Sequence, residues 1–313
     1  MAVSFFLLTD FGTTDPYVAQ MKGVLATLAP HHPIFDITHT VSAHNITQAA
    51  FFLDSTIDHL PPYSITICVV DPGVGTTRDI LCMVIGSRTI LAPDNGCISL
   101  LHARYENAQV YRIKQKQLPL KYTAHSCTFH GRTLFSPLAA DIANFITQQL
   151  SVRKHVTPIP FGKNSTQDCK KENHTTEKTH SDFMLGSYME KRGYALAENI
   201  ICQHDSTAHE QDNTIRTHVL HIDTFGNVVL NLPIPKWHKR IERGGELTVS
   251  TQTKRALQYI TAYAELKHNQ IGMICGSQGY LEIACNMCSA AELLNLSLGD
   301  HVTIHLSTSP ELN

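Results

Sequence analysis

Residues 64–78 read SITICVVDPGVGTTR, an apolar β-branched run that ends at Asp71, Pro72 and Gly73. A run of this length and composition is typical of a strand buried on both faces of a sheet. Proline and glycine directly after the run predict a tight turn that lets a ligand approach the backbone. The stretch therefore predicts a central strand whose carboxyl end carries Asp71.

The region before this stretch alternates short apolar strands with amphipathic helices. We predict strands at 4–9 and 34–37, and helices at 17–28 and 46–60. This alternation predicts an α/β fold with an N-terminal, mostly parallel sheet flanked by helices. Ligands bind beyond the carboxyl ends of the strands in such sheets. Because Asp10, Asp71 and Asp94 each follow a predicted strand, we expect them along one sheet edge.

The composition of the chain changes after about residue 160. Residues 162–187 are rich in Lys, Asn, Thr, His and Ser, which predicts a linker or a surface insertion. Short β-rich runs separated by Gly and Asn follow, and they predict a small β-barrel. We expect an N-terminal α/β domain at 1–160, a polar linker or insertion at 161–190 and a C-terminal β-barrel domain at 191–313.

The overall composition argues against several classes of protein. The formal net charge is -2 and no run of Lys or Arg stands out, so we expect no nucleic-acid partner. No apolar run approaches the roughly 20 residues of a membrane span, and the N-terminal run reads as a buried strand, not a signal peptide. We therefore expect a cytoplasmic protein with no membrane partner and with reduced cysteines. Cys285 and Cys288 lack a second ligand pair, which favours buried thiols over a zinc site.

Four stretches are rich in residue types that do chemistry, and each follows a predicted strand. They are Thr9–Tyr17, Val70–Arg78, Ala92–Gly96 and Thr128–Pro137. The turn after Asp71 can bring the Arg78 guanidinium back towards the carboxylate. On these residues alone, a structural Asp–Arg pair and a buried core histidine at His130 remain open as alternatives.

The four stretches, in this order, resemble the S-adenosylmethionine hydroxide adenosyltransferases, which are related to the fluorinases and chlorinases. In the C-terminal half, Asp223–Asn227 with Asn231, and Gly276–Ala284 followed by Ser289–Ala291, are similar to two further motifs of that family. The resemblance covers nearly all of the chain except about residues 150–215. It implies an N-terminal α/β domain, a C-terminal β-barrel and a homotrimer that binds S-adenosyl-L-methionine between subunits. It implies no metal and no organic cofactor.

The resemblance also implies roles for individual residues. Asp71, Arg78 and His130 match the hydrolytic triad of the family. Asp10 matches the carboxylate that binds the ribose 2′ and 3′ hydroxyls, a task suited to an acceptor-only group.

The predicted adenine contacts come from the C-terminal half. Phe225 matches a stacking residue, and Asn227 matches a contact through the side-chain amide. Ser277 matches a loop that meets the adenine and methionine ends of the substrate, and Gln278 stands where the halogenases carry arginine. The other residues that we predict to bind substrate are Phe11, Asp94, Asn95, Phe129, Asp223 and Glu282.

The residues at the reacting centre favour water over a halide as the nucleophile. The halogenases carry neither a carboxylate nor an imidazole at the positions of Asp71 and His130. A negative charge about 4 Å from a halide would cost roughly 4 kcal/mol at an effective dielectric of about 20. Gly131 stands where fluorinases carry a halide-binding serine, although chlorinases share this glycine.

We therefore expect in-line attack of an activated water at the ribose 5′ carbon, giving adenosine and L-methionine. Whether Asp71 or His130 takes the proton is open at this stage. The alternatives are a chlorinase-type halogenase and a non-catalytic protein that binds S-adenosylmethionine or adenosine.

Overall fold

The computed structural model describes most of the chain as two compact units, one ending at Cys202 and one following it. The described residues are 3–119, 128–152, 180–202, 208–244, 247–251 and 254–307. Within these ranges, no helix is both long and apolar enough to cross a membrane.

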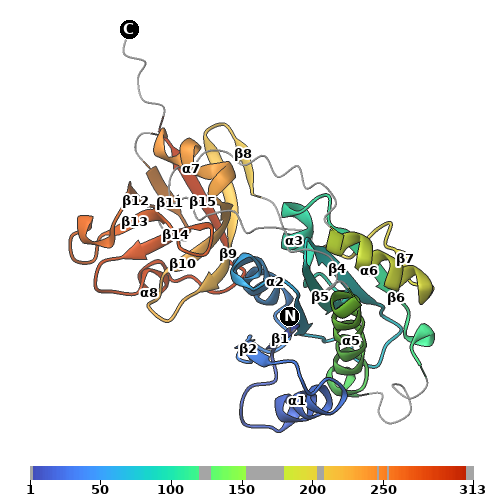
Figure 1. Ribbon diagram of the computed structural model, residues 1–313. Coiled ribbons are helices and arrows are strands. Elements are labelled where there is room, and N and C mark those ends of the chain that lie inside the picture. The colour runs from blue at the N-terminus through green and yellow to red at the C-terminus, as the bar shows by residue number, and fades with distance from the viewer. Residues whose placement is uncertain are drawn as a thin grey trace. The chain divides into compact units, whose positions relative to one another are not determined.

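The N-terminal unit is built on one seven-stranded sheet (Figure 1). Its strands are β1 (Ser4–Thr9), β2 (Ile34–Thr38), β3 (Ser64–Val69), β4 (Ile80–Ile85), β5 (Arg88–Pro93), β6 (Gln109–Ile113) and β7 (Ala195–Leu196). Their order across the sheet is β2-β1-β3-β5-β4-β6-β7. The first four strands in this order are parallel to one another, whereas β4 is antiparallel to both β5 and β6. The prediction of a mostly parallel sheet is confirmed.

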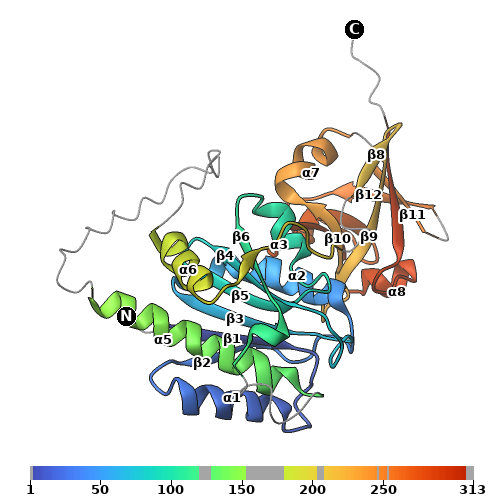
Figure 2. The same cartoon turned by 90° about the vertical axis from the view of Figure 1, so that its right-hand side faces the viewer.

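Helices cover both faces of this sheet (Figure 2). One face carries α1 (Tyr17–Leu28), α5 (Ser136–Val152) and α6 (His180–Lys191), and the other carries α2 (Ile46–Thr56) and α3 (Ser99–Arg104). Successive side chains of a strand point to opposite faces. Leu7 therefore packs with Met21 of α1, while Leu8 packs with Leu53 of α2. Burying each such side chain stabilises the fold by about 1.5–3 kcal/mol.

Helix α6 lies at the C-terminal end of the range 161–190, which the sequence predicts as a polar linker or insertion. Helix α6 begins at His180, and its side chains Met184, Leu185 and Met189 are buried against the N-terminal sheet. These apolar residues recur at helical spacing within a polar composition, which hid them from a composition argument. The chain then adds β7 to the sheet beside β6. Residues 153–179 lie outside the described part of the chain.

The C-terminal unit is a closed barrel of seven strands. The strands, in order around it, are β10 (Val228–Pro233), β14 (Tyr280–Cys285), β13 (Ile271–Cys275), β12 (Lys254–Tyr259), β11 (Leu247–Ser250), β15 (His301–Leu306) and β9 (Thr214–Ile222). Pairing of β9 with β10 closes the barrel, and β8 (His209–Gln211) extends it from β9. Helices α7 (Ile234–Glu242) and α8 (Ala290–Leu294) pack on the same core. The predicted small barrel is confirmed.

Cys285 and Cys288 differ from the expectation of free, reduced thiols. The structure joins them by a disulfide across the turn between β14 and α8. The turn places their Cα atoms 5.4 Å apart, within the range that a disulfide spans, and Met287 adopts a φ of 61° inside it. Three other cysteines, Cys68, Cys82 and Cys97, are buried free thiols.

Candidate active site

Three strand ends bring three aspartates to one edge of the N-terminal sheet. Asp10 follows β1, Asp71 lies two residues beyond β3, and Asp94 follows β5. These strands are parallel and adjacent in the sheet, so their carboxyl ends meet at the same edge. The sequence prediction of this common edge is confirmed.

The loop from Asp71 to Arg78 folds back on itself. Val74 N–H donates to the Asp71 carbonyl at 3.1 Å, and Thr76 N–H donates to the Gly73 carbonyl at 3.1 Å. Gly75 adopts a φ of 82°, a backbone conformation that is unfavourable for residues that carry a side chain. These two turns return the chain towards the strand end and place Arg78 beside Asp71.

Arg78 and Asp71 form a buried ion pair. Arg78 Nε donates to Asp71 Oδ1 and Oδ2, each at 2.8 Å, and Arg78 Nη2 donates to Oδ2. The side chains of Arg78 and Asp71 are only 8% and 3% exposed. A carboxylate has about four lone-pair sites, so three donated bonds leave one acceptor position on Asp71.

Arg78 also contacts His130, the third predicted residue. Its Nη2 lies 3.0 Å from His130 Nδ1. Because a guanidinium can only donate, Nδ1 must accept, and the neutral imidazole carries its proton on Nε2. Burial lowers the pKa of His130, and the positive charge of Arg78 lowers it further, against the opposing effect of Asp71. The structure thus brings the three predicted residues together, with a neutral histidine and an ionised pair.

His130 stands directly before a π-helical turn, η3 (Gly131–Phe135), which leads into α5. Such turns often mark functional sites. The guanidinium carbon of Arg78 lies 5.5 Å from the centroid of the Phe135 ring in this turn. Arg78 Nη1 is buried and hydrogen-bonds to no residue in the described ranges, so it is a donor still available to a bound molecule.

Two amide side chains hold the loop that carries Asp71 and Arg78. Gln115, in the 3-10 turn η2 (Gln115–Gln117), donates to the carbonyls of Thr76 and Arg78, each at 3.0 Å. Asn95 donates to the Val70 carbonyl at 2.9 Å, next to Asp71. We did not predict a role for Gln115 from the sequence. Gln115 lies 37 positions from Arg78 in the chain, and no local pattern indicates a contact between residues so far apart. The substrate-binding role of Asn95 stays a prediction.

Asp94 is also engaged within the protein. Its Oδ2 accepts from Arg112 Nη1, and its Oδ1 accepts from the Ile201 N–H at 3.0 Å. Arg112 Nη1 also binds Asp79 Oδ2 at 3.1 Å. Asp94 is 5% exposed and anchors this sheet edge, so its predicted contact with substrate stays a prediction.

Asp10 keeps one carboxylate oxygen for a ligand. Its Oδ2 accepts the His44 N–H at 2.8 Å, and no hydrogen bond to Oδ1 is found within the described ranges. His44 adopts a φ of 65°, and its Nδ1 lies 3.9 Å from the same carboxylate. The sequence missed His44, because its approach to Asp10 depends on how the loop before α2 folds.

Three aromatic rings join the first and fourth motifs. The Phe129 ring centroid lies 5.5 Å from that of Phe11 and 5.1 Å from that of Tyr17. Edge-to-face pairs of this kind stabilise by about 0.5–1.5 kcal/mol each. Gly131 lies under these rings, where an added Cβ would be 2.9 Å from both Met21 Sδ and the Phe129 ring.

Replacing Gly131 with serine is expected to destabilise the protein by about 1–3 kcal/mol, the usual cost of overpacking a core. A fluorinase-like side chain at this position therefore does not fit without movement of Phe129. Thermal unfolding of the purified variant measures the effect. Gly86, which has open space around its Cβ position, offers Gly86→Asn as a control in which asparagine tolerates the positive φ. An unfolding temperature equal to that of the wild type in Gly131→Ser would contradict the packing argument.

The predicted residues of the C-terminal unit form a second group on the loop between β9 and β10. Asp223 Oδ1 accepts from the N–H groups of Phe225 and Asn227, each at 2.9 Å, and Oδ2 accepts from the Asn227 amide at 2.9 Å. Gly226 packs on Ser289, and its carbonyl accepts from the Ala291 N–H at 3.0 Å. This fixed loop presents the Phe225 ring, which is 78% exposed, for contact with another planar group.

Glu282 and Ser277 lie on and before β14. Glu282 is buried and accepts a 2.6 Å hydrogen bond from Tyr263. Burial raises the pKa of Glu282, and the nearby negative charge of Asp223 raises it further, while the Tyr263 hydrogen bond lowers it. Ser277 is exposed in the turn between β13 and β14. The sequence missed Tyr263, which lies in a 3-10 turn without a motif.

Both halves of the chain match models of one protein family. Residues 5–150 match the SAM hydroxide adenosyltransferase N-terminal domain, and residues 217–303 match the SAM hydroxide adenosyltransferase C-terminal domain. The two matches together cover well over half of the 313 residues.

The chain is also similar to individual proteins. An (R)-S-adenosyl-L-methionine hydrolase from Thermus thermophilus is 35% identical over 143 residues, which are 44% of this chain and 56% of that protein. An (R)-S-adenosyl-L-methionine hydrolase from Salinispora tropica is 25% identical over 303 residues, with 95% of each chain covered. The crystal structure of an uncharacterized conserved protein from Thermotoga maritima matches with a TM-score of 0.73 and 25% identity, covering 97% of this chain and 100% of that chain. This chain thus spans little more than half the length of the first relative and nearly the whole of the other two.

Proposed function

Since this chain belongs to the SAM hydroxide adenosyltransferase family, we propose that it hydrolyses S-adenosyl-L-methionine to adenosine and L-methionine. The observation that carries this proposal is the contact of Arg78 with both Asp71 and His130. The sulfonium substrate loses a neutral thioether, so the reaction needs no general acid. It needs a water held in line with the 5′ carbon–sulfur bond and a group that takes the proton of that water.

Within this proposal, Asp71 takes the proton. His130 Nδ1 already accepts from Arg78, and a neutral imidazole whose proton is on Nε2 has no second acceptor. Asp71 retains one acceptor position after three bonds from Arg78. His130 Nε2–H would donate to the oxygen of the water and so fix its direction. Arg78 holds the carboxylate in position and sets the tautomer of the imidazole.

The remaining residues would bind the substrate. Asp10 Oδ1 would accept from a ribose hydroxyl, and the exposed Phe225 ring would stack on adenine. Release of L-methionine and the homotrimer are parts of the proposal that rest on family resemblance, and a cytoplasmic location is a part that rests on the composition of the sequence. Sedimentation velocity of the purified protein measures the oligomeric state.

The two alternatives fit the geometry less well. A desolvated halide near Asp71 would meet a carboxylate that is only 3% exposed, so solvent would screen the repulsion poorly. A protein that only binds the substrate needs neither a proton acceptor such as Asp71 nor the hydrogen bond that His130 would donate to a water. Hydrolysis uses all three groups.

The test is incubation of the purified protein with S-adenosylmethionine in H₂¹⁸O, with the products resolved by chromatography and mass spectrometry. Adenosine carrying ¹⁸O at the 5′ position and L-methionine are expected. A parallel sample at high chloride checks for 5′-chloro-5′-deoxyadenosine, which would favour the halogenase. Tight binding without any product would favour the non-catalytic protein.

Turnover is expected to be constant around neutral pH and to fall only below pH 6.5. The pKa of His130 lies below its ordinary value of 6.5, so the ring stays neutral until the solution is more acidic than that. Protonation would remove the Nδ1 acceptor and place a second cation beside Arg78. Because the pKa of His130 is lower in the folded protein than in the unfolded chain, the unfolded chain binds a proton more readily as the pH falls. The stability of the fold therefore decreases as the pH falls through this range.

A pH–rate profile of turnover number measures this effect, and His130→Asn serves as the comparison, since it cannot titrate. The acid limb of the wild type should be absent from the variant. An acid limb centred above pH 6.5, or one that the variant retains, would exclude His130 as its cause.

A further inference from the structure

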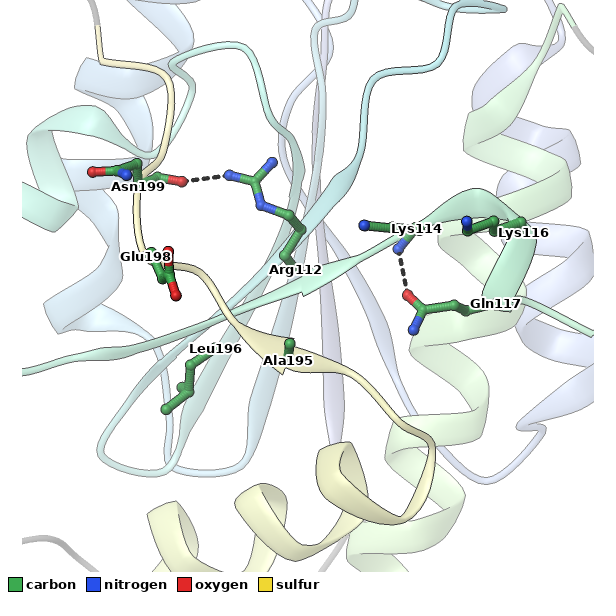
Figure 3. A pocket seen from close by; sticks show the side chains of 8 residues that line it. All are labelled: Arg112, Lys114, Lys116, Gln117, Ala195, Leu196, Glu198 and Asn199. Atoms are coloured by element: carbon green, nitrogen blue, oxygen red, sulfur yellow. Dashed lines mark hydrogen bonds between the residues drawn. The ribbon is translucent and has the colours of Figure 1, made fainter.

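A cavity of about 500 Å³ lies in the N-terminal unit beside β6, and none of the residues that line it is assigned above to the reaction (Figure 3). Arg112 of β6, followed by Lys114 and Lys116, lines it on one side. Residues 195–199, which include Leu196 and Glu198, run along the other. The volume falls within the range of small-molecule sites.

Two cationic side chains of this cavity, Lys114 and Lys116, differ from the third. Arg112 is held by the Asp79 and Asp94 carboxylates and by the Asn199 carbonyl, and Glu198 is the acidic side chain of the lining. Neither the Lys114 nor the Lys116 ammonium group has a hydrogen bond or an ion pair with any residue that the structure describes. These two ammonium groups, which line the same cavity, are therefore available to an anion.

We propose that this cavity binds a phosphate-bearing small molecule. Lysine ammonium groups suit a phosphate because each offers a compact charge with three donors that adapt to its oxygens. Ala195 pairs with Arg112 across the sheet, so its side chain lies on the same face and provides an apolar contact for the rest of the ligand.

The chain that lines the cavity also holds the candidate active site. Arg112 Nη1 binds both Asp79, the residue after Arg78, and Asp94. Gln115, between the two lysines, donates to the carbonyls of Thr76 and Arg78. A phosphate in the cavity would compete with the two carboxylates for Arg112, so its binding would loosen this support and lower turnover.

The experiment is isothermal titration calorimetry of the full chain with inorganic pyrophosphate and, separately, with uridine triphosphate, which carries its phosphates on a nucleoside without adenine. The test variant is Lys114→Gln with Lys116→Gln, which removes two charges and keeps most of each stem. The matched control is Lys239→Gln with Lys267→Gln, two exposed lysines of the C-terminal unit.

Saturable binding that weakens about tenfold or more in the test variant, and is unchanged in the control, is expected. Tighter binding of the nucleotide would identify a nucleotide phosphate as the ligand, and equal binding would identify a free phosphate. No saturable binding of either probe, or equal affinity in wild type and test variant, would overturn the site. These results do not depend on hydrolysis of S-adenosylmethionine, so they stand apart from the proposed function.

Turnover at saturating pyrophosphate tests the link to the active site. A decrease in the wild type that is lost in the test variant is expected. Unchanged turnover while pyrophosphate is bound would overturn the link through Arg112.

Discussion

Replacing Asp71 with asparagine is expected to lower turnover of S-adenosylmethionine about 100- to 10,000-fold, the scale for loss of an acid–base group. Asparagine keeps the size of the side chain and one carbonyl oxygen, so the loop from Asp71 to Arg78 can still form. It cannot take the proton of the attacking water. Chromatographic measurement of adenosine at saturating substrate gives the turnover number.

Substrate affinity should survive in Asp71→Asn, because the predicted ribose and adenine contacts come from other residues. Calorimetry with the substrate separates affinity from turnover. The matched control is Asp141→Asn, which alters an ion pair with Arg192 whose N–O distance is 3.6 Å and whose arginine is 40% exposed. Full turnover in Asp71→Asn would show that this carboxylate is not the proton acceptor.

Replacing Arg78 with glutamine is expected to lower turnover by about 100-fold or more, since both Asp71 and His130 lose their shared donor. It is also expected to cost about 3–5 kcal/mol of stability, because it leaves a buried carboxylate without its partner. The small exposure of both side chains means that water cannot replace the lost contacts. Thermal unfolding and the turnover assay measure the two effects on one preparation.

Arg192→Gln is the matched control for this second variant. Its surface ion pair with Asp141 should contribute no more than about 1 kcal/mol. Arg78→Lys adds a finer comparison, since lysine keeps the charge but cannot contact Asp71 and His130 with one planar fork. If Arg78→Gln unfolded at the wild-type temperature, the buried pair would not have the strength that its geometry implies.

Much of the N-terminal sheet could be predicted because its signals are local. Helix α1 has the predicted bounds, and the buried run of β3 ends within one residue of its prediction. The return of Arg78 towards Asp71 also depends on a few turn residues. The partnership with His130 spans 52 residues and came only from resemblance, since a contact of that separation leaves no periodic trace.

Two elements that we did not predict differ in their local signals. Helix α7 places Ile234, Trp237 and Ile241 on one face at helical spacing, so its sequence does carry the pattern of a helix. Strand β12 buries only Leu257, so its sequence lacks the alternation of a strand that is buried on one face. The position of β12 therefore depends on its neighbours in the barrel, which the sequence does not display.

The contacts around the predicted site could not be read from sequence for a related reason. Asp94 and Asn95 satisfy backbone and arginine groups that lie far away in the chain, and their residue types would suit a ligand equally well. Gln115 and His44 contact the site only because of how the loops before them fold. A side-chain type indicates what a residue can do, whereas tertiary structure decides what it contacts.

The π-helical turn between His130 and α5 has a consequence for the length of this segment. Such a turn holds more residues than a turn of α-helix, and each residue of a regular helix advances by about 100° around the axis. Loss of one residue between Gly131 and Phe135 would therefore rotate His130 away from Arg78 while leaving the packing of α5 in place. In sequences that descend from a common ancestor with this chain, the number of residues here should vary less than their identities, because the spacing itself aims the imidazole.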